Sequence, residues 1–127
     1  MITKLQIVVL GTVGMLAVAS PISAHHSWPV DCSTAMTVTG TVRGYTWANP
    51  HVMIGLEVTG DDGAVENWTV GGPSLRRMAD NTWDGDTLKP GDVITGTGNP
   101  FLDGSNVLKL SKIVMSDGTE MVLYDNC

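Results

Sequence analysis

The run MTVTGTVRGYTWA, residues 36–48, alternates between two kinds of side chain in the manner of a half-buried β-strand. One face is apolar or small and consists of Met36, Val38, Gly40, Val42, Gly44 and Thr46. The other face is polar and consists of Thr37, Thr39, Thr41 and Arg43. Because glycines inside a strand allow sharp bends, the run predicts a strongly curved first strand.

Short β-rich runs separated by turns fill the rest of the chain. We expect further strands over residues 51–59, 64–70, 93–98, 107–115 and 120–124, with one short amphipathic helix over 73–80. The sequence therefore predicts an all-β fold with one short helix. A curved first strand and a helix between the third and fourth strands favour a small closed barrel of the OB type. An open β-sandwich is the alternative.

The beginning of the chain has the features of a secretory signal. Lys4 supplies a positive charge, and residues 7–18 form an apolar stretch too short to cross a bilayer comfortably. We expect cleavage after Ala24, where a stretch of small residues ends, and cleavage after Ala19 is the alternative. The predicted mature protein, residues 25–127, is one domain, periplasmic or secreted from a bacterial cell, with no stable membrane span.

Charge and cysteine content fit an exported protein. The formal net charge of −6 makes nucleic acid and anionic lipid poor candidates for partners. Cys32 and Cys127 would meet oxidising conditions after export, so we predict a disulfide between them. A thiolate ligand for copper is the alternative. The disulfide would hold the start of the mature chain near the body of the domain.

The three histidines are the strongest candidates for chemistry. If cleavage follows Ala24, the terminal amine and the ring of His25 form a bidentate chelate. His51 could add a third nitrogen, and three nitrogens in this arrangement, called a histidine brace, suit copper(II). Alternatively, the amine, the next backbone amide and His26 could bind copper(II) without help from the fold. His25 and His26 could also form no more than a polar terminus of the mature chain.

Strand periodicity places His51 away from the core. Since the apolar residues of the second strand occupy every other position from Val52, His51 and Met53 share the opposite face. Met53 could offer its thioether to copper(I), although a half-exposed methionine needs no such role. Tyr45 and Trp47 fall on the polar side of the first strand and could line the same site. Packing at the rim of the barrel is the alternative for both.

No sequence motif of a conventional enzyme is present: the chain lacks G-x-S-x-G, H-E-x-x-H, a phosphate-binding loop and C-x-x-C. The runs His25-His26-Ser27, Trp47-Ala48-Asn49-Pro50-His51 and Leu88-Lys89-Pro90-Gly91-Asp92 resemble a family of short exported bacterial proteins of unknown function. That family has a mature His-His-Ser start and a W-x-N-P-H motif. The resemblance implies an exported β-rich domain in which His25, His26 and His51 matter, and it implies no activity.

Three functions are consistent with the sequence. The favoured one is a copper-binding accessory protein that binds, delivers or senses the metal, possesses no catalytic activity, and works with a periplasmic or membrane partner protein. The second is a non-enzymatic module that binds a ligand or protein through the face near Tyr45, Trp47 and Met53. The third is a histidine-brace copper oxidoreductase, which would need an open copper position and reductant-dependent oxygen chemistry.

Overall fold

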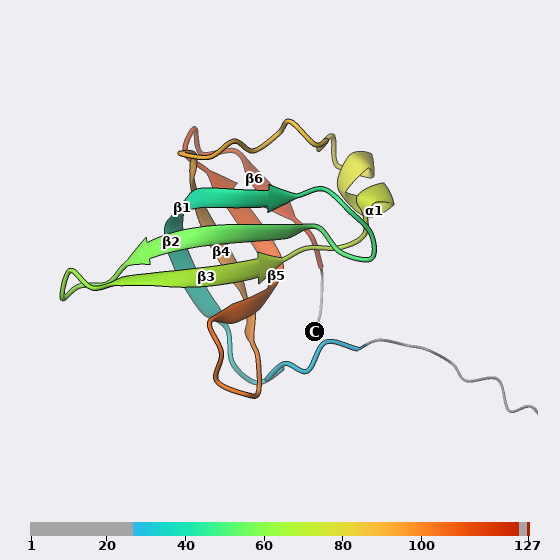
Figure 1. Ribbon diagram of the computed structural model, residues 1–127. Helices are drawn as coiled ribbons and strands as arrows, with labels where there is room; N and C mark the ends of the chain where they lie inside the picture. Colours follow the sequence, from blue (N-terminus) through green and yellow to red (C-terminus); the bar gives the residue numbers. More distant parts are fainter. Residues whose placement is uncertain (1–26, 125–126) are drawn as a thin grey trace, which may run out of the picture.

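The computed structural model describes residues 27–124 and residue 127. Its elements follow the chain in the order β1 Met36–Thr46, β2 Met53–Thr59, β3 Val65–Gly71, α1 Leu75–Asp80, β4 Val93–Pro100, β5 Val107–Met115 and β6 Glu120–Val122 (Figure 1). This order confirms the predicted all-β fold with one short helix. The predicted elements agree with it to within two residues. The two-residue differences are that β1 and β6 end earlier, β2 and α1 begin later, and β4 ends later.

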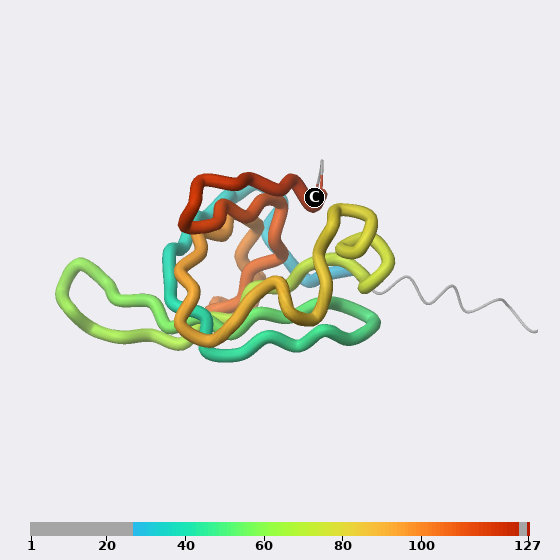
Figure 2. The backbone as a smooth tube through the Cα atoms, turned by 90° about the horizontal axis from the view of Figure 1, so that it is seen from above, coloured from blue at the N-terminus to red at the C-terminus, as the bar shows by residue number. Residues whose placement is uncertain are grey.

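The strands close into a barrel. Antiparallel pairing runs in the order β3-β2-β1-β4-β5, and a parallel pairing of β3 with β5 joins the two ends. The strand β6 adds to β5 outside this ring. Figure 2 shows the ring of strands from above, with the β2–β3 hairpin projecting from one side. The closed OB-type barrel is therefore confirmed, and the alternative of an open sandwich is wrong.

The core of the barrel follows the predicted alternation. Val52, Ile54 and Leu56 are fully buried, whereas His51 before them and Met53 between them are half-buried. The helix α1 contributes the fully buried Met78 to the same core. Because each fully buried side chain of this size stabilises the fold by about 1.5–3 kcal/mol, the apolar face fixes which face of β2 turns outward. His51 and Met53 therefore point away from the interior.

A β-bulge in β1 corrects the predicted faces of its last residues. Val42 pairs with Leu56 and Gly44 pairs with Gly55, so Arg43 is an extra residue on β1. The extra residue reverses the alternation: Thr46, expected inside, is exposed, and Tyr45, expected on the polar side, packs against the core. The bulge depends on the partner strand, and periodicity within one strand does not reveal it.

None of the helices among residues 27–124 has the length and apolar character needed to cross a membrane.

Candidate functional site

His51 lies in the loop between β1 and β2, directly after a cis Asn49–Pro50 peptide bond. Hydrogen bonds tie this loop to the segment that leads into α1. The amide of Val52 donates to the carbonyl of Pro73 at 3.0 Å, and the side-chain oxygen of Asn49 accepts from the amide of Leu75 at 3.2 Å. The backbone that carries His51 is therefore fixed on both sides by the start of the helix.

The indole of Trp28 covers the ring of His51. The two ring centroids are 4.5 Å apart, and the ring planes are inclined by 53°. Phe101, which follows β4, contacts the same indole edge-on at 5.8 Å. The segment that enters the barrel thus meets the β1–β2 loop and the β4–β5 loop at one place.

The absence of a side chain at Gly71 leaves room for the indole of Trp28. A Cβ atom at Gly71, the last residue of β3, would overlap the indole of Trp28 and lie 3.2 Å from the sulfur of Met53. Met53 is paired with Gly71 across β2 and β3. The missing side chain therefore lets the indole approach the sheet, with His51 and the Met53 thioether as its neighbours.

One nitrogen of His51 has no partner in the described part of the chain. Its Nδ1 atom is buried and makes no hydrogen bond to residues 27–124 or 127. A buried polar atom without a hydrogen bond costs about 1–3 kcal/mol. Imidazole nitrogens bind copper and zinc, and either ring nitrogen can serve. The buried Nδ1 is thus a polar atom with no hydrogen-bond partner among the described residues.

Backbone contacts with the end of β4 and the residues just after it anchor the segment that carries Trp28. Val30 forms a bridge with Phe101, the amide of Asp31 donates to the carbonyl of Pro100 at 2.9 Å, and the amide of Leu102 donates to the carbonyl of Pro29 at 2.9 Å. These contacts attach the segment to the end of β4. They fix the backbone that carries Trp28, so that its indole lies against Gly71.

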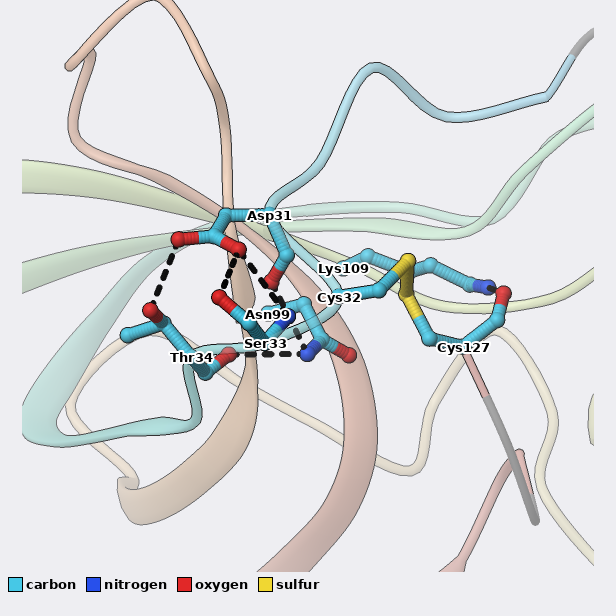
Figure 3. Close-up of a disulfide and its surroundings, with 7 residues drawn as sticks. All are labelled: Asp31, Cys32, Ser33, Thr34, Asn99, Lys109 and Cys127. Atoms are coloured by element: carbon cyan, nitrogen blue, oxygen red, sulfur yellow. Dashed lines mark hydrogen bonds between the residues drawn. A yellow bond between two sulfur atoms is a disulfide. The ribbon is translucent and has the colours of Figure 1, made fainter.

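A disulfide and a tight turn complete the anchor (Figure 3). Cys32 is bonded to Cys127, with the two Cα atoms 5.6 Å apart, which confirms the predicted disulfide and makes the alternative of a copper thiolate wrong. The carboxylate of Asp31 accepts hydrogen bonds from the hydroxyls of Ser33 at 2.6 Å and Thr34 at 2.7 Å. These hydrogen bonds, the Ser33 hydroxyl first, lower the pKa of the Asp31 carboxyl. The turn is thus stabilised by the ionised carboxylate.

Tyr45 and Trp47 lie beside a different part of the chain. The hydroxyl of Tyr45 donates to the carbonyl of Asp84 at 2.8 Å, and its ring meets that of Trp83 at 6.4 Å. A Cβ atom at Gly85 would lie 3.5 Å from the indole of Trp47. Burial, with a smaller contribution from the nearby charge of Asp84, raises the pKa of Tyr45 to about 12. Both rings therefore pack against the segment after α1, and the described contacts of His51 are with Trp28.

A pair of cations around the ring of Tyr124 was not anticipated from the sequence. The ammonium of the buried Lys109 lies 4.5 Å from the ring centre of Tyr124 and donates to the carbonyl of Cys127 at 2.8 Å. The guanidinium of Arg77 lies 5.3 Å from the same ring. Burial raises the pKa of the Tyr124 phenol. The only sequence signal was a lysine among the apolar residues of β5, and such a lysine needs a partner.

No group of three or more His, Cys, Asp or Glu side chains suited to a metal gathers within residues 27–124. His25 and His26 lie outside the described residues, so the predicted three-nitrogen set is represented by His51 alone. The site that the structure describes is therefore one imidazole, with an indole over it and a thioether beside that indole.

The described residues form a closed five-stranded barrel with a sixth strand added, and the contact between Trp28 and His51 lies at its β1–β2 loop. The chain belongs to DUF6152, a family of unknown function, whose sequence profile matches residues 10–108. The matched part includes all three histidines. No curated protein has significant similarity to the chain.

Proposed function

We propose that the protein is an exported copper-binding accessory protein in which His25 and His51 hold copper(II). The amine and ring of a terminal His25 would provide two nitrogens, and the ring of His51 would provide the third. The contact between Trp28 and His51 is the observation that carries this proposal. It brings the chain immediately after the histidine pair against the third histidine, although these residues are far apart in sequence.

The length of the chain allows His25 to reach the site. Only His26 and Ser27 lie between His25 and Trp28, and three Cα-to-Cα steps of at most about 3.6 Å each keep the two Cα atoms within about 11 Å. The indole of Trp28 already contacts the ring of His51. The buried Nδ1 of His51 also has no partner among the described residues, as expected of a nitrogen reserved for a ligand.

The chemistry of the nitrogens and the disulfide both support a copper site in an exported protein. Amine and imidazole nitrogens bind copper(II) more tightly than they bind the neighbouring divalent metals of the first transition row. The disulfide is stable in an oxidising compartment, which agrees with the proposed cleavage after Ala24 and a periplasmic or secreted location. We further propose that residues 25–127 act as one domain and that a periplasmic or membrane partner protein receives the metal.

Copper(II) titration followed by electron paramagnetic resonance tests the proposal. The protein would begin at His25, verified by mass spectrometry, and all strands, the helix and both cysteines lie within this part of the chain. We expect one tight equivalent with a three-nitrogen spectrum that changes in His51→Ala. A spectrum that does not depend on His51 would overturn the folded site and favour a non-metal binding module. Oxygen consumption with a reductant would instead identify an oxidoreductase.

A further inference from the structure

Trp28 lies over Gly71 with the Met53 sulfur near the same position, and its indole also contacts His51. His51 comes from the β1–β2 loop, Met53 begins β2, and Trp28 precedes the strands. The indole contacts the imidazole at 4.5 Å between centroids. The indole overlaps the place where a Cβ of Gly71 would be, and the Met53 sulfur lies 3.2 Å from that same Cβ position. The arrangement therefore joins an imidazole, a thioether and an indole face at one spot.

These three groups have a common chemical preference. A thioether is a soft ligand that selects copper(I) over harder ions, and imidazole also accepts copper. A cation over the face of an indole is attracted by the negative face of the ring, and Trp is the strongest of the aromatic side chains in this respect. None of the three groups is a carboxylate, which calcium and magnesium would require. The set is suited to a soft monovalent cation.

The backbone allows both ligands to meet one ion. His51 and Met53 are two residues apart and point to the same side, which places their Cα atoms about 6.5–7 Å apart. Met has three rotatable bonds and can bring its sulfur toward the imidazole. The Nδ1 atom of His51 has no hydrogen-bond partner among the described residues, so no such bond would have to break.

We propose that His51 and Met53 bind copper(I), or silver(I) as its chemical analogue, beneath the indole of Trp28. This site deepens the proposed copper function, because it would keep the metal bound after reduction. It shares only His51 with the copper(II) site and needs neither His25 nor His26. Trp28 acts here by shielding the ion from water and by its ring face.

Silver(I) is the probe, because it needs no reductant to stay monovalent. Silver nitrate would be titrated into the exported, disulfide-bonded protein, with calorimetry giving affinity and tryptophan emission reporting on Trp28. We expect one equivalent to bind and to change the emission, with affinity at least tenfold weaker in Met53→Leu and lost in His51→Ala. Trp28→Phe should bind more weakly and lose most of the emission change. Met121→Leu, at another half-buried methionine on β6, is the matched control and should bind like the wild type.

The Met53 methyl resonance gives a second measurement that requires no variant. It should shift on addition of one equivalent of silver(I), while the Met121 methyl should not. Equal affinity in Met53→Leu and wild type, or an unmoved Met53 methyl, would overturn the inference.

The His25→Ala/His26→Ala double variant separates the two proposals. Silver(I) binding that survives there while the copper(II) spectrum is lost supports both sites. Silver(I) binding that persists when the wild type shows no three-nitrogen copper(II) spectrum refutes only the copper(II) proposal. Loss of silver(I) binding in the double variant refutes the site at His51 and Met53.

Discussion

The ring centroids of Trp28 and His51 lie 4.5 Å apart, although the two residues belong to separate segments of the chain. The contact depends on two sets of restraints. The disulfide and the pairing with β4 hold the segment of Trp28, and hydrogen bonds to the start of α1 hold the loop of His51. Trp28, close to the predicted mature terminus, thus contacts His51 because neighbouring residues hold both segments in place.

His51→Ala should weaken copper(II) binding by about tenfold or more, or roughly 1.4 kcal/mol, because one of three nitrogens is removed. The unfolding free energy should change by less than about 1 kcal/mol, since His51 is half-buried and its Nδ1 has no described hydrogen bond to lose. Copper titration and urea unfolding measure the two effects. His26→Ala is the matched comparison and should leave the three-nitrogen spectrum intact. If His26→Ala abolishes the spectrum and His51→Ala does not, binding is local to the terminus.

A single glycine added before His25 should disrupt the copper(II) site without altering the fold. The extension moves the free amine away from the His25 ring, so the terminal chelate is lost while all three imidazoles remain. Electron paramagnetic resonance should show fewer coordinated nitrogens, and affinity should fall by roughly tenfold or more. Unchanged affinity would show that the rings alone bind the metal.

Gly71→Ala should displace the indole of Trp28 and destabilise the protein by about 1–3 kcal/mol, because its Cβ would overlap the indole. Gly55→Ala, in the paired strand β2, is the matched control: its Cβ would lie no closer than 3.6 Å to any atom outside its chain neighbours. Urea unfolding measures stability, and nuclear magnetic resonance measures the ring-current shift of the His51 protons. Equal effects of the two substitutions on that shift would contradict the packing of Trp28 against Gly71.

Replacing both Cys32 and Cys127 with serine should lower the unfolding free energy by about 2–5 kcal/mol, because the bond closes a loop spanning 95 residues. Urea unfolding of the variant and of the oxidised wild type gives the difference. The reduced wild type is the control and should match the variant. A loss well under 1 kcal/mol would mean that the pairing of Val30 with Phe101 holds the segment without the disulfide.

Tyr45→Phe should cost about 1 kcal/mol at neutral pH through loss of the hydrogen bond to the Asp84 carbonyl. Burial raises the pKa of Tyr45 from 10.0 to about 12, so its contribution is complete below pH 10 and disappears as the pH rises toward 12. The stability difference between wild type and variant should therefore shrink over that interval. Urea unfolding at a series of pH values measures it.

Absorbance of tyrosinate provides the check on that assignment, because Tyr45 and Tyr124 are the only tyrosines. The variant should lose the titration near pH 12 and retain that of Tyr124. A Tyr45 titration near pH 10 would contradict a buried, hydrogen-bonded phenol.

Local patterns were sufficient to predict most of the strands and the outward face of β2. Alternation of Val52, Ile54 and Leu56 with polar or small residues indicates which side is buried, and the structure confirms it. The same reasoning failed at Thr46, because the bulge at Arg43 arises from pairing with β2. It also placed Tyr45 on the polar side, whereas the bulge turns its ring toward the core beside Trp83.

The sequence by itself determined the strand succession, the position of the helix and the pairing of the two cysteines, since each depends on local periodicity, turn residues or a count of two thiols. Only the tertiary structure decided that Trp28 lies over Gly71 beside Met53 and contacts His51. That arrangement requires closure of the barrel through β3 and β5 and the attachment of the entering segment to β4. Contacts between distant segments depend on how the whole chain packs, and no local pattern encodes them.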